Sequence, residues 1–162
     1  MKKILLTFGL LTVLTYAEIN ECDKLAGNPN DKSLNGIGVE FEQLDADKAI
    51  EVCTEALKKE SENVRNMYEL GRAYDKKEDY IKALEWYGKE AGQGYANAQN
   101  NLGNIYSNGQ GVKQNYAKAV EWYEKAANQG YVDAQFNLAA MYMGGQGVKQ
   151  DVNRGVKLGS FS

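Results

Sequence analysis

Apolar and small side chains recur at helical spacing through most of the chain after residue 60. The first stripe has the spacing i, i+3, i+4, i+7 and consists of Met67, Leu70, Gly71 and Tyr74. A second stripe with a helical period runs through 83–91, after the polar link 76–78. Two amphipathic helices joined by a short polar link predict a helical hairpin.

The chain also repeats itself with a period of 36 residues. Segment 94–114 matches 130–150, and upstream Trp86-Tyr87 falls on Trp122-Tyr123. A period of this length is typical of stacked solenoids. We therefore predict an all-α fold, an α-solenoid of stacked antiparallel helix hairpins.

We expect three hairpin repeats at 62–95, 96–131 and 132–162. A cap over 18–61 precedes them, and its segment 49–57 has the pattern of the second helix of one more, degenerate unit. The third repeat is short. Its second helix has Gly155 and Gly159 where the second repeat has Ala119 and Tyr123, so we expect this helix to fray, because glycine is a poor helix former.

The glycine pairs 109/111 and 145/147 are interpreted as helix ends rather than phosphate-binding loops. Neither pair follows a predicted strand or completes a Gly-x-Gly-x-x-Gly motif. Glycine just after a helix adopts the left-handed cap conformation, and Asn115 or Asp151 then supplies the N-cap of the next helix.

These motifs carry a family resemblance. The pattern Leu70-Gly71-x-x-Tyr74 with Ala83, Tyr87 and Ala91 resembles a tetratricopeptide unit. The second and third units carry four more residues between their helices than the first does, and these insertions contain the glycine pairs. With them, residues 62–158 resemble the Sel-1-like repeat family. The resemblance implies that the first helix of each hairpin lines a concave surface.

The N-terminus has the layout of a secretory signal peptide over residues 1–17. A basic start, Met1-Lys2-Lys3, precedes the apolar run 4–14, and cleavage is expected between Ala17 and Glu18. A membrane anchor is the alternative, but this run is shorter than the roughly 20 apolar residues that span a bilayer. A lipoprotein is disfavoured because Ile19-Asn20-Glu21, before Cys22, lacks small residues. We predict an exported protein, periplasmic or secreted, without stable membrane insertion once the signal is removed.

Export affects the interpretation of the two cysteines. Cys22 and Cys53 form the sole pair in the sequence, and an even number of cysteines in an oxidising compartment favours a disulfide. Two isolated buried thiols are the alternative. The predicted bridge would tie the N-terminal segment to the degenerate helix.

Composition removes several classes of chemistry. The 162 residues include no His, which excludes a Ser-His-Asp triad, a Cys-His pair and an imidazole metal ligand. The net charge of −3 gives no sign of a nucleic-acid partner. We expect no catalytic residue, cofactor or metal.

One surface feature points to binding. Asn97, Asn100, Asn104 and Asn108 fall on one side of the first helix of the second repeat, away from Ala98 and its apolar stripe. Their amides suit a peptide backbone, although a solvated asparagine-rich face is the alternative. Matching repeat positions adds Arg65, Tyr68, Arg72 and Lys76 from the first repeat and Asp133 and Phe136 from the third.

Three functional classes remain. The favoured one is an interaction module that binds an extended peptide or partner protein on the concave face, with the basic residues holding a carboxylate. Some cysteine-rich Sel-1-like relatives have been described as penicillin-binding proteins or weak β-lactamases, but this chain lacks Ser-x-x-Lys, Ser-Asp-Asn and Lys-Thr-Gly. A structural role in the envelope is the third class. We also consider self-association through an exposed face of the C-terminal repeat.

Overall fold

The computed structural model describes residues 19–30, 34 and 36–160. The predicted signal peptide, 1–17, and the cleavage position between Ala17 and Glu18 lie outside these residues. Within them the regular structure is helical, with no strand, as predicted. The elements are α1 (Glu21–Ala26), the 3₁₀ helix η2 (Phe41–Gln43), α2 (Ala46–Lys59), α3 (Val64–Lys76), α4 (Tyr80–Ala91), α5 (Ala96–Asn108), α6 (Tyr116–Ala127), α7 (Val132–Gly144) and α8 (Val152–Gly159).

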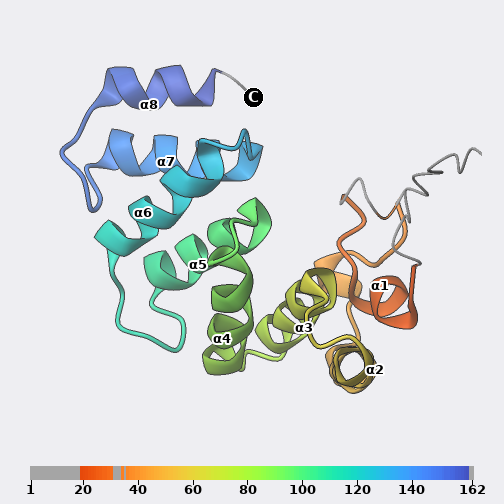
Figure 1. Ribbon diagram of the computed structural model, residues 1–162. Coiled ribbons are helices and arrows are strands. Elements are labelled where there is room, and N and C mark those ends of the chain that lie inside the picture. The colour runs from red at the N-terminus through yellow and green to blue at the C-terminus, as the bar shows by residue number, and fades with distance from the viewer. Residues whose placement is uncertain (1–18, 31–33, 35, 161–162) are drawn as a thin grey trace, which may run out of the picture.

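The helices stack in chain order. The pairs α3/α4, α5/α6 and α7/α8 form hairpins, and each hairpin packs on the next through α4 against α5 and α6 against α7. Figure 1 shows this progression from α1 at one end of the molecule to α8 at the other. At the N-terminal end α2 packs on α3, and α1 contacts both. Since almost all contacts join neighbours along the chain, the molecule is an α-solenoid.

Glycine and asparagine or aspartate define the ends of the later helices, as predicted. Gly109 and Gly145 end α5 and α7 with φ of 69° and 65°, the left-handed conformation that glycine adopts without strain. The Asn115 side chain accepts a hydrogen bond from the backbone N–H of Lys118 at the start of α6. Asp151 does the same for the N–H of Arg154 in α8. The loop motif therefore positions each second helix.

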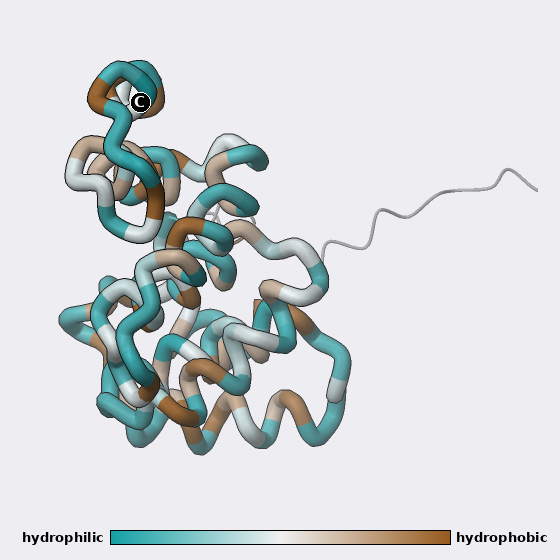
Figure 2. Tube along the Cα trace, turned by 90° about the vertical axis from the view of Figure 1, so that its left-hand side faces the viewer, coloured by the Kyte–Doolittle hydropathy of each residue, from teal (hydrophilic) through white to brown (hydrophobic). Residues whose placement is uncertain are grey.

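Small residues allow the two helices of a hairpin to approach closely. A Cβ placed on Gly71 would lie 2.7 Å from the ring of Tyr87, and one placed on Gly103 would lie 2.4 Å from the ring of Tyr123. Both tyrosine rings are buried. Figure 2 shows hydrophobic and hydrophilic residues interspersed along the helical turns, which fits helices that bury one face.

The last helix lies close to α7, and its fraying stays a prediction. α8 runs over Val152–Gly159 and lies against α7. Gly155 is buried, and a Cβ at this position would lie 2.5 Å from Cγ of Met143. The glycine that we expected to weaken α8 therefore also permits its close approach to α7.

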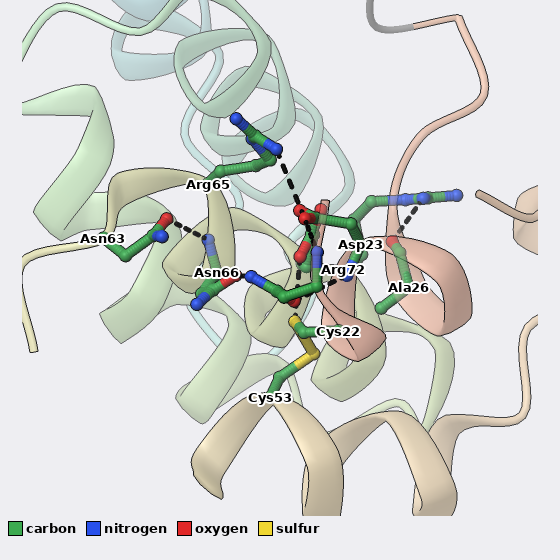
Figure 3. Close-up of a disulfide and its surroundings, with 10 residues drawn as sticks. Cys22, Asp23, Ala26, Cys53, Asn63, Arg65, Asn66 and Arg72 are labelled. Carbon is green, nitrogen blue, oxygen red and sulfur yellow. Dashed lines mark hydrogen bonds and ion pairs between the residues drawn. A yellow bond between two sulfur atoms is a disulfide. The ribbon is translucent and has the colours of Figure 1, made fainter. Parts of the chain in front are cut away.

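The N-terminal segment is tied to the solenoid by the predicted disulfide. Cys22 in α1 and Cys53 in α2 are joined with an S–S distance of 2.03 Å, and Figure 3 shows the bridge between the two helices. Among the described helices, none has both the length and the apolar composition needed to cross a bilayer.

Candidate interaction surface

A cavity of about 1050 Å³ lies where the first helices of the three repeats begin. It draws residues from the starts of α3, α5 and α7, from the end of α4 and from the N-terminal segment. The lining residues are Asn28, Asn30, Glu62, Asn63, Val64, Arg65, Tyr68, Glu90, Tyr95, Asn97, Gly130, Tyr131, Val132 and Asp133. The cavity therefore spans all three repeats.

Four of the predicted site residues line this cavity: Arg65, Tyr68, Asn97 and Asp133. Arg65, Asn97 and Asp133 occupy the same position in the three repeats, and stacking brings them to one side of the solenoid. The structure therefore brings these four residues together at one place on the surface, and their role in binding stays a prediction.

Aromatic side chains form much of the remaining lining. Tyr95 and Tyr131 occupy the N-cap positions of α5 and α7, where neither makes a side-chain capping bond. The ring of Tyr68 lies 5.8 Å from that of Tyr87, centroid to centroid. Burial raises the pKa of Tyr68 and of Tyr131 above the ordinary value of 10.0. These phenols are therefore neutral at physiological pH.

The basic residues predicted to hold a partner's carboxylate are already engaged. Arg72 is 5% exposed, and its Nη1 and Nη2 donate to the carbonyl oxygens of Ala26 and Val39 at 2.6 and 3.1 Å. The Lys76 Nζ donates to the carbonyl oxygen of Glu42. The prediction that Arg72 is open to a partner was wrong, because the N-terminal segment covers its side chain. Lys76 is half-buried, and its hydrogen bond is exposed to solvent.

Arg65 is also paired within the protein. Its Nη1 lies 3.3 Å from Oδ2 of Asp23, a fully buried carboxylate on α1. Figure 3 shows Arg65 and Arg72 both directed toward the segment that contains the disulfide. The positive charges at this end of the surface therefore compensate buried acceptors.

Two of the predicted asparagines, Asn100 and Asn104, make hydrogen bonds between repeats. Asn137 Nδ2 donates to Oδ1 of Asn100 and of Asn104, at 3.1 and 3.3 Å. The Tyr123 hydroxyl also donates to Asn104 Oδ1, at 2.7 Å. Asn100 is 5% exposed, so the expectation that it points away from the core was wrong. Asn137 of α7 reaches this face of α5 through these hydrogen bonds.

The remaining predicted residues lie on open surface outside the cavity lining. Asn108 is exposed at the last turn of α5. Phe136 on α7 is 67% exposed, which is unusual for a phenylalanine.

Glu90, a buried acid in the cavity wall, was not among the site residues predicted from the sequence. Glu90 is 1% exposed, and its Oε2 atom has no hydrogen-bond partner among the described residues. Loss of hydration raises the pKa of this carboxyl from 4.5 to about 9. The matching position of the second repeat is Ala126, which is also buried. A comparison of these two positions would have singled out Glu90.

A second buried acid, Glu69, lies beside the disulfide. Its Oε2 is 2.8 Å from the Cys22 sulfur. Burial first, and then the nearby Asp23 carboxylate, raises the pKa of Glu69 to about 10. Since a disulfide sulfur carries no proton, the protonated Glu69 is the donor. Ligand atoms of Cys22, Cys53 and Glu69 lie within 4.8 Å of one another. A metal would need thiolates, and the disulfide provides none.

Comparisons with known proteins agree with this architecture. The Sel1 repeat matches residues 66–95, 96–131 and 132–159. A structure of a protective antigen present in uropathogenic Escherichia coli strains, displaying an SLR fold, is similar with a TM-score of 0.64 and 35% identity. That alignment covers 78% of this chain and 27% of the antigen, so this chain spans about a quarter of that protein.

Two shorter proteins are also similar. A Sel1 repeat protein from Oxalobacter formigenes is 30% identical with a TM-score of 0.62, over 68% of this chain and 86% of that chain. Helicobacter pylori cysteine rich protein B shares the fold at 24% identity and a TM-score of 0.54, over 76% of this chain and 89% of that chain. A search of curated proteins found no significant match. The three consecutive repeat matches, which cover more than half of the chain, confirm the resemblance noted in the sequence: the chain belongs to the Sel1 repeat family.

Proposed function

We propose that this protein is an exported interaction module that binds an extended segment of a partner protein on the side formed by α3, α5 and α7. Sel1 repeat proteins are typically protein-interaction modules. The observation that carries the proposal is the cavity of about 1050 Å³, which takes residues from all three repeats. Its volume is at the upper end of small-molecule sites, roughly 300 to 1000 Å³, so it can hold several residues of a peptide.

The chemistry of the lining suits a peptide. Amide side chains such as Asn97 and Asn28 can donate to and accept from a peptide backbone. Tyr95 is half exposed and offers a rigid apolar ring with a polar tip. Both residue types are common where proteins bind varied polypeptide segments.

Location outside the cytoplasm is part of the proposal. It is supported by the signal-like N-terminal sequence and by the Cys22–Cys53 disulfide, a bond that persists in oxidising compartments. Fractionation of the native host, with the mature N-terminus determined by sequencing, tests this point. Recovery of an uncleaved, reduced protein in the cytoplasm would contradict export.

A photo-crosslinking experiment tests the binding surface. A benzophenone amino acid is placed at Asn97 or at Phe136 on the proposed surface, with Glu85 or Glu121 as controls on the exposed faces of the second helices. After irradiation in the native envelope, adducts are identified by mass spectrometry. We expect the same partner at positions 97 and 136 and no adduct at 85 or 121. Adducts confined to 85 and 121 would place binding on the outer helices instead.

We further propose that two copies associate through the C-terminal face of the third repeat. Val120 on α6 is 5% exposed, whereas the matching Val156 on α8 is 59% exposed. Val152 is likewise exposed. A second copy would continue the packing by which α7 covers α6 within the chain.

Sedimentation equilibrium tests this association. We expect the wild-type protein to dimerise and Val156→Glu to be monomeric. Ile81→Glu is the matched control, because Ile81 is similarly exposed but lies on α4, away from this face. A monomeric wild-type protein would contradict self-association, as would an equal loss in both variants.

A further inference from the structure

Glu90 is placed where stability alone does not explain it. It is 1% exposed and its Oε2 has no partner among the described residues. Burying a polar group without a hydrogen bond is unfavourable. The second repeat fills the same position with Ala126, which shows that the fold accepts an apolar residue there. A buried titratable group that destabilises the fold and lines a cavity is typical of a binding site.

The charged groups around Glu90 are mostly acidic. Glu62 precedes α3, and Asp133 lies in the first turn of α7; both line the cavity and both are exposed. Among the lining residues that the structure describes, the one cation is Arg65, which is already paired with buried Asp23 at 3.3 Å. The remaining charge favours a positively charged ligand.

Aromatic rings complete the wall. Tyr68 comes from α3, while Tyr95 and Tyr131 come from the starts of α5 and α7. Their ring faces carry negative partial charge and attract cations. Carboxylates combined with several aromatic rings are the environment in which proteins hold guanidinium and ammonium groups.

We infer that this cavity receives a basic side chain of the partner, an arginine or a lysine, with the Glu90 carboxylate as its buried counter-ion and the three tyrosines around it. The inference rests on the proposed function and specifies the ligand chemistry of that surface. It reverses the expectation from the sequence, in which basic residues of this chain were to hold a carboxylate of the partner.

A carboxylate ligand is the competing possibility, because helix N-termini favour anions. Two of the three helix starts here are already compensated, however. The Asn63 side chain caps α3, and Asp133 places an acid in the first turn of α7. An anion would also meet the side chain of Glu62 in the same cavity.

Binding of a cation changes the protonation of Glu90. Without a ligand Glu90 is protonated at neutral pH, since desolvation raises its pKa to about 9. A cation beside the carboxyl favours the ionised form, so binding releases the Glu90 proton to solvent. Burial raises the pKa of Tyr68 and Tyr131 and keeps these phenols neutral. The other charged groups of the described lining are Glu62, Asp133 and Arg65, and the Arg72 guanidinium acts electrostatically on Tyr68 and Tyr131. Affinity for a cation therefore rises with pH, approaching about tenfold per pH unit below the pKa of the empty site.

The test uses the folded protein and two small probes, N-acetyl-arginine methylamide and its neutral isostere N-acetyl-citrulline methylamide. Binding is followed by NMR titration and by calorimetry in two buffers that differ in ionisation enthalpy. We expect the arginine probe to bind with a Kd of about 1 mM, as for a single side chain. We expect the citrulline probe to bind roughly tenfold or more weakly. Calorimetry should show release of up to one proton at neutral pH.

Variants at position 90 separate this site from general surface charge. Glu90→Gln mimics the protonated acid, and Glu90→Ala copies the residue of the second repeat. Both should lose roughly tenfold or more in affinity for arginine and all proton release. Glu85→Gln, on an exposed part of the same helix, is the matched control and should behave as wild type. The measurement of proton release uses the wild-type protein, so it does not depend on whether a variant folds.

Several results would overturn the inference. They are equal binding of arginine and citrulline, unchanged binding in both Glu90 variants, or tighter binding of an acidic probe such as N-acetyl-aspartate methylamide. Photo-crosslinking then distinguishes a failure of the cation site from a failure of the proposed partner-binding surface. If adducts at position 97 persist while the arginine probe fails, the proposed partner-binding surface stands and the cation site is wrong. If arginine binds through Glu90 but no adduct forms on the inner helices, the cation site stands and the partner-binding proposal is wrong.

Discussion

The side chain of Asn137 on α7 donates a hydrogen bond to Oδ1 of Asn100 on α5, at 3.1 Å. This contact joins equivalent helices of successive repeats and lies in a largely buried position, since Asn100 is 5% exposed. An asparagine-rich helix that looked like a solvated or peptide-binding face is in part the polar seam between two repeats. Its residues should therefore affect stability before they affect binding.

The first prediction concerns this seam. Asn100→Ala together with Asn104→Ala removes both acceptors of Asn137 and the acceptor of the Tyr123 hydroxyl. We expect a loss of about 1 to 3 kcal/mol in the free energy of unfolding, because buried donors are left unpaired. Urea denaturation followed by circular dichroism measures it. Asn108→Ala is the control and should change stability by less than about 0.5 kcal/mol, because Asn108 is exposed. Equal effects in the two proteins would contradict a structural role for the seam.

A second prediction concerns the close approach of α5 and α6. Gly103→Ala would place a Cβ 2.4 Å from the Tyr123 ring, so it should destabilise the protein by about 1 to 3 kcal/mol through overpacking. Gly88→Ala is the matched control in α4, since a Cβ there meets no atom within 4 Å. The control should gain about 0.5 to 1 kcal/mol from better helix propensity. Melting temperatures that move in the same direction for both variants would count against this packing.

The disulfide gives a third prediction. Cys22 and Cys53 are 31 residues apart, and closing a loop of that size stabilises a folded chain by about 3 to 4 kcal/mol in the chain-entropy estimate. Alkylation of the exported protein without reductant should label no thiol, and proteolysis should yield a joined Cys22–Cys53 peptide. The Cys22→Ser, Cys53→Ser protein should unfold at lower urea concentration. Two labelled thiols in the native protein would show that the bond does not form in vivo.

The fourth prediction is a pH dependence of stability. Burial raises the pKa of Glu90 from 4.5 to about 9, so the folded state binds this proton more tightly than the unfolded state does. The resulting stabilisation is fully present below pH 4.5 and is lost as pH rises toward 9. Burial and Asp23 raise the pKa of Glu69 in the same direction, to about 10.

Urea unfolding at about pH 5 and pH 8 measures this dependence. The wild-type protein should be less stable at the higher pH. Glu90→Gln should reduce that difference, because glutamine keeps the neutral form at both pH values. The exposed Glu85→Gln change should leave the difference as it is in wild type. A pH dependence unaffected by Glu90→Gln would show that Glu90 ionises normally.

The fifth prediction concerns catalysis. The purified protein should hydrolyse β-lactams no faster than a buffer blank. The sequence has no His and none of the serine-lysine motifs that activate a nucleophile in these enzymes. A spectrophotometric assay with a chromogenic cephalosporin checks this. Turnover that survives repurification and scales with protein concentration would support an enzymatic function instead.

The repeat architecture of this protein was readable from its sequence. Helix formation, glycine caps and the spacing of Gly103 from Tyr123 depend on local backbone conformation and on neighbours within one hairpin. Such local preferences repeat whenever the sequence repeats. The disulfide also followed from the sequence, because two cysteines allow one pairing.

The accessibility of the polar residues was decided by tertiary structure. The Arg72 side chain meets the carbonyl oxygen of Ala26, 46 residues earlier, and Asn100 meets Asn137, 37 residues later. A helical period places these side chains on a face but carries no information about which distant segment covers that face. Glu90 was not predictable for the same reason. The cavity that it lines, where its Oε2 has no hydrogen-bond partner, forms only when the starts of α3, α5 and α7 come together. Local periodicity therefore determined the solenoid, whereas long-range packing determined which part of its surface is free to bind.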